Sequence, residues 1–231
     1  LLWASFFLSS TSCYSQALEA NHWYFGYRSG MVFYPDGPKA DTNGVSRSIQ
    51  AVATISDAQG KLLFYASEKN IYTASHDTMK NGKNVLNSVN LIIQKQPKSN
   101  NLYWLFSWDL SGTKFFVIDL NKNNREGEVV SSGFIANNHS ATGMAICDHA
   151  NGEDKWIVFK KLGKEEFVSY LLTSNGLNVM SPVVSAFSGR FPQSQFYMKS
   201  SPNSRFISAV YRYPRNEVTI FRFNNLNGQL N

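Results

Sequence analysis

The chain has 231 residues, of which 43% are hydrophobic, 14% aromatic and only 16% charged, with a formal net charge of +6. This length suits one large domain or two small ones, and the apolar share is enough for a real core. Few charges and many aromatic residues favour a β-rich secreted protein over a helical cytosolic one. The basic residues are spread along the chain without a nucleic-acid-binding motif, so we expect no specific nucleic-acid partner.

The first residues, LLWASFFLSSTSCYSQA, hold an apolar run followed by small polar residues. This pattern is typical of the hydrophobic and cleavage regions of a secretory signal peptide, and the run is too short to span a bilayer. We predict a signal peptide, truncated at its N-terminus, over residues 1–16, and one mature domain over residues 17–231. Cys13 is alternatively a lipid-bearing cysteine, although the residues before it make a poor lipobox. Cys147 lies in the apolar run GMAIC, which predicts a buried, inert thiol.

The next stretch, NHWYFGYRSGMVF, covers residues 21–33 and combines aromatic residues with glycines. It is either a platform on which a ligand stacks or a strand with large packing side chains. Because it precedes the first full repeat, we expect a leading strand that completes the last blade of a ring. Trp23, Phe25 and Phe33 would then be packing residues, and Gly26 and Gly30 would provide the bend between segments.

Four later segments share one layout of a strand, a polar turn, a second strand, a tight turn and a third strand. Their middle strands start near Lys61, Leu102, Lys155 and Arg205, at spacings of roughly 41, 53 and 50 residues, which is the period of a four-stranded propeller blade. The fourth strands are expected in the connecting stretches GEVVSSGFIA and NVMSPVVSAF. SHDTMKNGKNVL is expected to be a loop that includes one helical turn.

The fold class predicted from this pattern is all-β, a β-propeller of four-stranded antiparallel blades. About four blades are present, whereas six to eight are commoner in propellers. We therefore expect an incomplete ring, with its C-terminal blades beyond Asn231.

Several motifs in order carry a family resemblance: NHWYFGYRSGMVF, TISDAQGKLLFYAS, SHDTMKNG, DHANGEDKWIV and YLLTSNGL. Together they resemble the N-terminal, WD40-like propeller region of large secreted Bacteroidetes proteins. Those proteins are exported by type IX secretion and often end in a gliding-motility-associated (type B) sorting domain. The resemblance implies export and a location at the cell surface or outside the cell. It brings no catalytic residues, and Ser67-Glu68 departs from the Asp-Gly pair that is common in the family.

A glycosidase needs two carboxylates that face one cleft. Asp57, Asp109 and Asp148 fall at strand ends beside turns, where an Asp side chain accepts backbone N–H groups. The stretch DLNKNNREGEVV begins like a calcium loop at Asp119, but it lacks the loop glycine and the final glutamate. We assign no catalytic residue, metal site or cofactor. Asp77, Glu153 and Asp154 are the other carboxylates that could belong to a glycosidase pair.

Four residues are candidates for ligand binding: Trp108, Tyr213, Asp148 and His149. Trp108 and Tyr213 lie near turns, where an aromatic side chain best escapes packing between blades and can stack on a ligand. Asp148 and His149 stand together in DHANGEDKW, the most polar turn of the chain. Acid–base chemistry is one interpretation of that pair. The repeat pattern favours a structural one, in which both residues order the turn and Trp156 packs in the blade.

The function expected from the sequence is that of a secreted or cell-surface binding or scaffold module within a larger type IX-exported protein. Its partners would be proteins or polysaccharides at the cell surface, contacted through loops at one end of the ring. Two alternatives remain: a propeller-type carbohydrate-active hydrolase or lyase, and a periplasmic sensor domain. We expect no transmembrane segment, and the sequence leaves the oligomeric state open.

Overall fold

The computed structural model of the chain describes residues 18–48, 51–67, 69–88, 90–109, 111–137, 141–161, 164–187, 196–211 and 217–231. Within them the chain is almost entirely β-structure, which confirms the all-β prediction. Only two 3-10 turns interrupt the strands there, η1 (Leu18–Ala20) and η2 (Asn123–Arg125). The predicted signal peptide, with Cys13, and the candidate Tyr213 lie outside the described residues.

The strands form five antiparallel sheets that follow one another along the chain. Sheet 1 holds β1 (His22–Phe25), β2 (Ser29–Tyr34) and β3 (Gly37–Ala40), and sheet 2 holds β4 (Val52–Ser56), β5 (Leu62–Ser67) and β6 (Asn70–Thr73). Sheet 3 holds β7 (Asn90–Lys95), β8 (Leu102–Asp109), β9 (Gly112–Asp119) and β10 (Glu128–Asn137). Sheet 4 holds β11 (Ala141–Asp148), β12 (Lys155–Lys161) and β13 (Glu166–Thr173), with β14 (Gly176–Leu177) and β15 (Val183–Ala186) both paired to β13. Sheet 5 holds β16 (Phe196–Ser200), β17 (Phe206–Tyr211), β18 (Val218–Asn224) and β19 (Gln229–Leu230).

The four repeats identified in the sequence correspond to sheets 2 to 5. The connecting stretches GEVVSSGFIA and NVMSPVVSAF contribute the expected additional strands, β10 and β15, which pair with β9 and β13. SHDTMKNGKNVL forms turns and isolated bridges, which confirms the predicted loop, and it contains no helical turn. A β-bridge between Tyr72 and Thr78 connects the segment to β6.

The stretch of residues 21–33 differs from the prediction of a single leading strand. It forms the hairpin of β1 and β2, which belongs to a sheet of its own with β3. Gly26 and Arg28 adopt positive φ in the turn, which allows the chain to reverse there. Gly30 faces the ring of Tyr24, and a Cβ at that position would lie 2.5 Å from the ring. The aromatic and glycine pattern therefore encodes a tightly packed hairpin.

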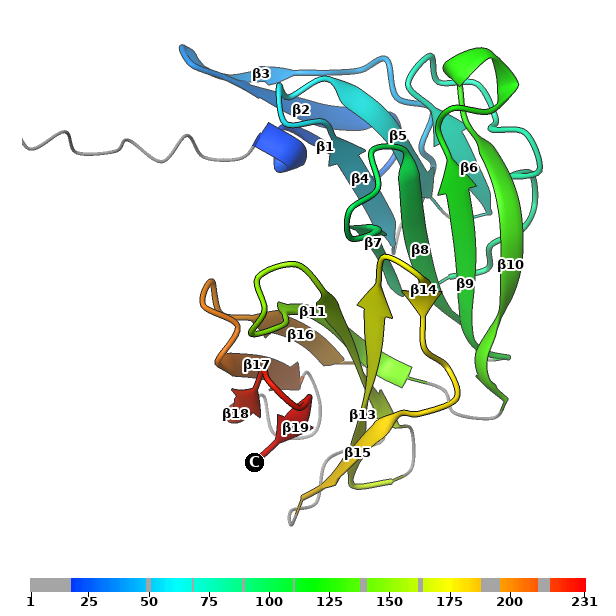
Figure 1. Cartoon of the computed structure of the whole chain (residues 1–231). Helices are drawn as coiled ribbons and strands as arrows, with labels where there is room; N and C mark the ends of the chain where they lie inside the picture. Colours follow the sequence, from blue (N-terminus) through cyan, green and yellow to red (C-terminus); the bar gives the residue numbers. More distant parts are fainter. Residues whose placement is uncertain are drawn as a thin grey trace, which may run out of the picture.

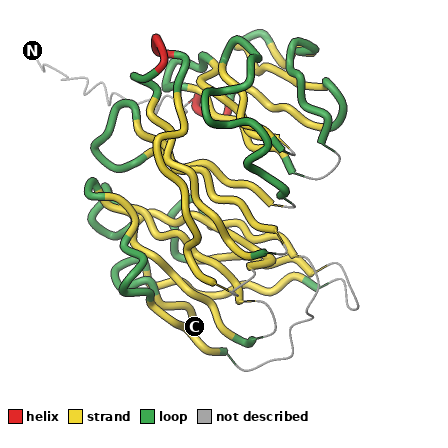
Figure 2. The backbone as a smooth tube through the Cα atoms, turned by 90° about the vertical axis from the view of Figure 1, so that its right-hand side faces the viewer, coloured by secondary structure: helices red, strands yellow, loops and turns green. Residues whose placement is uncertain are grey.

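The five sheets are arranged along an arc (Figures 1 and 2), and their first strands lie next to one another. β1 contacts β4, β4 contacts β7, β7 contacts β11, and β11 contacts β16. Each pair of neighbouring sheets encloses one cluster of buried hydrophobic side chains. Strands in the middle sheets therefore bury side chains on both faces, as in β12, where Trp156–Lys160 are all buried.

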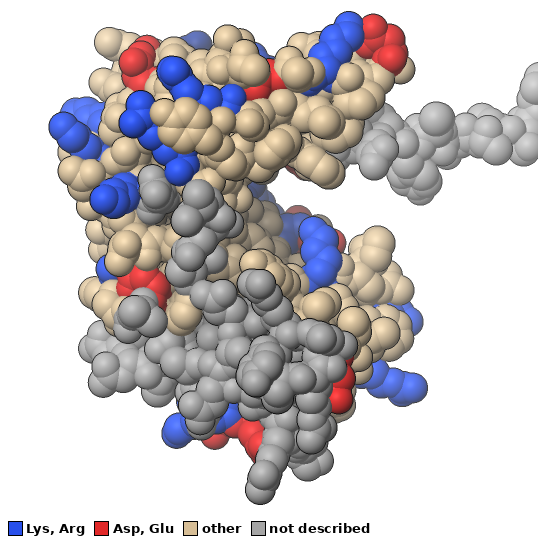
Figure 3. All heavy atoms as spheres, turned by 180° about the vertical axis from the view of Figure 1, so that it is seen from behind, with Lys and Arg blue, Asp and Glu red and all other residues tan. Residues whose placement is uncertain are grey.

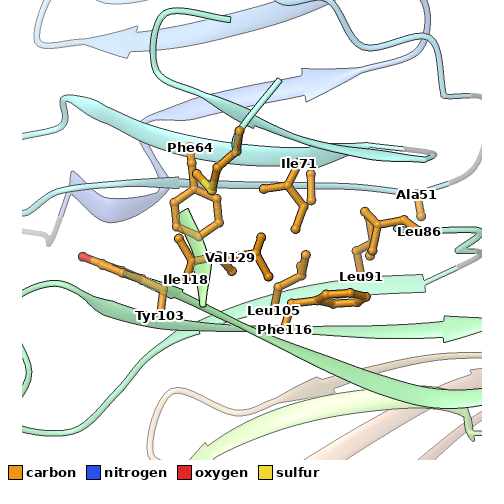
Figure 4. Packing of buried hydrophobic residues seen from close by; sticks show 12 residues of the cluster. Ala51, Phe64, Ile71, Leu86, Leu91, Tyr103, Leu105, Phe116, Ile118 and Val129 are labelled. Carbon is orange, nitrogen blue, oxygen red and sulfur yellow. The ribbon is translucent and has the colours of Figure 1, made fainter. Parts of the chain in front are cut away.

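The cluster between sheets 2 and 3 shows how this packing works (Figure 4). Phe64 and Ile71 of sheet 2 point toward Leu105 and Ile118 of sheet 3, and all four side chains are fully buried. The rings of Phe64 and Tyr103 meet edge to face, with their centroids 5.6 Å apart. Burying one such side chain is worth about 1.5–3 kcal/mol, so the clusters account for much of the stability.

A tryptophan and a glycine recur at two successive sheet interfaces. Trp104 of sheet 3 packs against Gly176 of sheet 4, and Trp156 of sheet 4 packs against Gly228 of sheet 5. Hydrogen bonds accompany both contacts, because Gln96 Nε2 donates to the Ser174 carbonyl (2.8 Å) and Trp156 Nε1 donates to the Asn225 carbonyl (3.0 Å). Trp156 is therefore a packing residue, as the repeat pattern predicted.

The outward faces of the two end sheets are not covered by other described residues. On sheet 1, Trp23 and Phe25 are 52% and 47% exposed, so the described residues do not bury them, and their role in closing a ring stays a prediction. Trp23 does meet the half-buried Phe33 edge to face at 4.8 Å. On sheet 5, Tyr197 and Ile220 are 66% and 67% exposed.

The packing of Trp156 on Gly228 predicts the effect of adding one methyl group. A Cβ at Gly228 would lie 2.7 Å from the Trp156 ring, whereas a Cβ at Gly152 would meet nothing within 4 Å. Both glycines have a φ near +77°, so the backbone strain of an alanine is matched between them. We expect Gly228→Ala to lower the free energy of unfolding by about 1–3 kcal/mol more than Gly152→Ala, measured by urea denaturation. Equal losses would contradict the packing described here.

Candidate functional site

A cleft of about 490 Å³ opens between residues of sheets 2, 3 and 4, around the turn between β7 and β8. Its lining comes from η1, the ends of β4 and β7, the turn between β7 and β8, and the start of β12. Ile55 and Ile93 supply apolar surface, and Gln94 supplies an amide. In Figure 3, a hollow separates the upper and lower parts of the molecule, with charged side chains at its edges.

Three lysines give the cleft its charge. Lys98 forms an ion pair with Glu153 across sheets 3 and 4, with Nζ and Oε2 2.8 Å apart, and Lys155 pairs with Asp148. The hydrogen bond to Glu153 raises the pKa of Lys98. Among the described residues, Lys95 forms no ion pair within 4 Å, so its ammonium group remains available to a ligand.

Carboxyl and phenol groups at the cleft come from Glu19 and Tyr103. Glu19 carries the only carboxylate among the described lining residues. Tyr103 packs in the cluster between sheets 2 and 3 and points its hydroxyl away from that cluster (Figure 4). Burial raises the pKa of Tyr103, and the carboxylates of Glu19 and Asp57 act in the same direction. The Tyr103 hydroxyl therefore stays protonated and can donate a hydrogen bond.

Asp148 is the last residue of β11 and His149 begins the turn to β12; neither lines the cleft. The Nδ1 atom of His149 accepts the backbone N–H of Asn151 (3.0 Å), and its ring lies 5.7 Å from that of Trp156. Asp148 does not accept a backbone N–H as expected; its carboxylate pairs with Lys155, and its own N–H donates to Ser204 Oγ. Both residues order the turn, which confirms the structural interpretation, and their role as ligand contacts stays a prediction.

Trp108 is buried, with 4% of its surface exposed, in the cluster between sheets 3 and 4. The prediction that it escapes packing to contact a ligand was wrong, because both faces of sheet 3 are covered. Its indole N–H is buried and finds no hydrogen-bond partner among the described residues. Cys147 is also buried and free, and burial raises the pKa of its thiol to about 12, as the inert-thiol prediction requires.

The carboxylates of Asp57, Asp109 and Asp119, three further catalytic candidates, have structural contacts. Asp57 Oδ1 accepts the backbone N–H groups of Gln59 and Lys61, and Asp119 Oδ1 accepts that of Asn121. Asp109 accepts the N–H of Ser111 at 2.7 Å and pairs with Lys114 at 3.0 Å. In the described part of the chain, no group of three or more His, Cys, Asp and Glu side chains is placed to hold a metal ion.

Sequence reasoning missed the residues that line the cleft. Gln94, Lys95 and Lys98 lie in the polar stretch QKQPKSNN, which reads from sequence as a strand end and turn. Glu19 and Lys155 come from distant parts of the chain. No local signal joins these three segments; only the packing of consecutive sheets does.

Comparisons with known proteins give little further information. No family model and no curated protein matches the chain. Among solved structures, it is similar to a protein of Bacteroides fragilis proposed to be a 6-phosphogluconolactonase, with 10% identity and a TM-score of 0.39. The match covers 88% of this chain and 75% of that one. A similarity of this strength carries no argument about function. Within the described residues, no helix has the length and apolar character needed to cross a membrane.

The contacts of Asp109 predict a pH-dependent contribution to stability. Burial opposes its ionisation, but hydrogen bonds from Ser111 and Lys114 outweigh burial and lower the pKa of Asp109 below 3.8. A lowered folded-state pKa means that this contribution is fully present above the unfolded-state pKa and is lost as the pH falls through the folded-state value. We expect Asp109→Asn to lower the free energy of unfolding by about 1–2 kcal/mol at pH 7, with the difference from the native chain shrinking below pH 3.8.

The matched control for that experiment is Asp36→Asn. It removes an exposed ion pair with Lys39, so its effect should stay within about 0.5 kcal/mol. Urea denaturation between pH 2 and pH 7 measures both variants. A difference for Asp109→Asn that does not change with pH would contradict the assignment.

Proposed function

We propose that the chain is a binding module built as a series of propeller-type blades. The support is the arrangement of consecutive antiparallel sheets, with first strands side by side and one buried cluster between each neighbouring pair. This arrangement is typical of propeller blades. Turns at one end of such a scaffold are held in fixed positions and commonly carry the binding residues.

The cleft is the binding site in this proposal, and its ligand is a protein or a glycan. The observation that carries the proposal is the combination of one unpaired ammonium (Lys95), an amide (Gln94) and the Tyr103 hydroxyl around apolar Ile55 and Ile93. Such a mixture of a few placed polar groups on apolar surface is typical of ligand sites. A polyhydroxylated sugar or a peptide backbone offers matching donors and acceptors.

Binding is favoured over glycoside hydrolysis by what the acidic residues do. Hydrolysis of that type uses two carboxylates on opposite sides of the scissile bond. Near the cleft, Glu153 and Asp148 are paired with Lys98 and Lys155, and Asp57 accepts backbone N–H groups. These carboxylates stabilise the turns that shape the cleft.

The cellular location is part of the same proposal. We infer a secreted or cell-surface module of a larger Bacteroidetes-type protein exported by type IX secretion. The motif resemblance in residues 21–177 and the apolar N-terminal run support this inference.

A binding screen followed by mutation of the cleft tests the proposal. Immobilised neutral and acidic oligosaccharides are screened with the full chain, and the best binder is titrated by calorimetry. Lys95→Ala and Gln94→Ala are each expected to weaken binding about 5–10-fold, through the loss of one charged or polar contact. Lys122→Ala, an exposed lysine in the turn between β9 and β10, should change it less than twofold.

Two results would overturn the proposal. One is that cleft variants bind as tightly as the native chain. The other is release of reducing sugar that is abolished by Glu19→Gln, which would establish a hydrolase instead.

A further inference from the structure

A second recess, of about 430 Å³, lies on sheet 2 beside the turn between β5 and β6. It shares no lining residue with the cleft. We call it the Arg47 recess, and it is lined by Val45, Arg47, Lys69, Asn70, Tyr72, His76, Asp77 and Thr78. Its lining residues therefore come from the connection between sheets 1 and 2, from β6 and from the segments on either side of β6.

The Arg47 recess is basic. Among the described lining residues, Arg47, Lys69 and His76 are basic and Asp77 carries the one carboxylate. The Arg47 guanidinium lies over the ring of Tyr27, 5.5 Å from its centroid, and this contact holds the side chain in place. Within the described residues, neither Arg47 nor Lys69 forms an ion pair within 4 Å. Figure 3 shows several Lys and Arg side chains on the upper left of the molecule.

His76 is fixed by its surroundings. It has a φ of +69°, which is uncommon for a residue other than glycine, and its Nδ1 lies 3.3 Å from the hydroxyl of the fully buried Tyr65. That hydroxyl already accepts the N–H of Val45 at 3.1 Å, so its own proton is free to bond Nδ1. In that arrangement the neutral imidazole carries its proton on Nε2, as a further donor.

Neutral hydrogen-bonding groups surround these donors. The Tyr72 hydroxyl accepts from Asn70 Nδ2 at 2.9 Å, and the Tyr72 ring stacks on Tyr65 at 5.0 Å between centroids. Thr78 is exposed at the edge of the recess. A guanidinium, an ammonium and an imidazole N–H suit an oxyanion, whereas amide and hydroxyl groups suit the hydroxyls of a sugar ring.

We propose that the Arg47 recess binds the anionic group of an acidic saccharide residue, such as a uronate carboxylate or a sugar sulfate. Arg47 makes the paired hydrogen bonds to the oxyanion, and Lys69 supplies a second positive charge. Asn70 and Thr78 contact ring hydroxyls. This site is independent of the cleft and does not rest on the function proposed for it.

Titration calorimetry of the full chain tests the ligand class. The probes are a trigalacturonate, a sulfated galactose trisaccharide, a neutral galactose trisaccharide, inorganic phosphate and a glutamate-rich peptide. We expect measurable binding of the acidic trisaccharides and at least 10-fold weaker binding of the neutral one. Tighter binding of the peptide or of phosphate than of both acidic sugars would overturn the saccharide assignment.

Matched variants test the location. Arg47→Ala and Lys69→Ala should each weaken acidic-trisaccharide binding about 10-fold or more. The affinity of Arg47→Lys should lie between those of Arg47→Ala and the native chain, because lysine keeps the charge but loses the two parallel N–H donors of the guanidinium. Lys83→Ala removes an exposed lysine that lines neither the recess nor the cleft, and its affinity should stay within twofold of that of the native chain. Each variant is checked for native circular dichroism. A loss with Lys83→Ala equal to that with Arg47→Ala would indicate binding by diffuse charge, and unchanged binding with both Arg47→Ala and Lys69→Ala would place the site outside the recess; either result overturns the proposal.

Discussion

Face-to-face packing of consecutive sheets is the constraint on which the rest of the structure depends. None of the five sheets is large enough to bury a core alone, and each cluster of hydrophobic side chains is completed only by the neighbouring sheet. The recurring contact of a tryptophan with a glycine, Trp104 with Gly176 and Trp156 with Gly228, sets how closely two sheets approach. Beside the first of these contacts, the hydrogen bond from Gln96 to the Ser174 carbonyl anchors the turn between β7 and β8, and that turn lines the cleft.

The sequence was sufficient to predict the repeating architecture. Alternating apolar residues indicate strands, and turn residues such as those around Asp57 indicate where the strands end. Both signals span only a few positions, so they can be recognised in the sequence without knowledge of the packing. The same reasoning failed for residues 21–33, because a hairpin and a single strand differ only in the turn at Gly26 and Arg28. It also failed for Trp108, whose burial depends on the sheet that covers it.

The candidate sites could not be predicted in the same way. Sequence reasoning singled out acidic and aromatic residues, because those residue types carry known chemistry. In the structure, Asp109 and Asp148 stabilise turns through lysine partners, and Trp156 packs between sheets. The charged side chains proposed to contact ligands are Lys95, Arg47 and Lys69, which resemble ordinary surface residues in sequence. Their significance comes from neighbours that are distant along the chain, such as Glu19 for the cleft and His76 for the Arg47 recess.

The uncovered faces of the end sheets have a consequence for the dynamics of the chain. Sheets 2, 3 and 4 each have two neighbours, whereas sheets 1 and 5 each contact one, and aromatic side chains such as Trp23 and Tyr197 remain in water. In a linear series of units, a terminal unit gains only one interface and opens at a lower free-energy cost than an internal one. Amide hydrogens of β8 and β12 should therefore exchange with solvent far more slowly than those of β2 and β17. The Arg47 recess lies on sheet 2 near sheet 1, where amide hydrogens are expected to exchange faster than in the middle sheets. A ligand bound in the recess would therefore slow exchange in sheet 1 as well as in sheet 2.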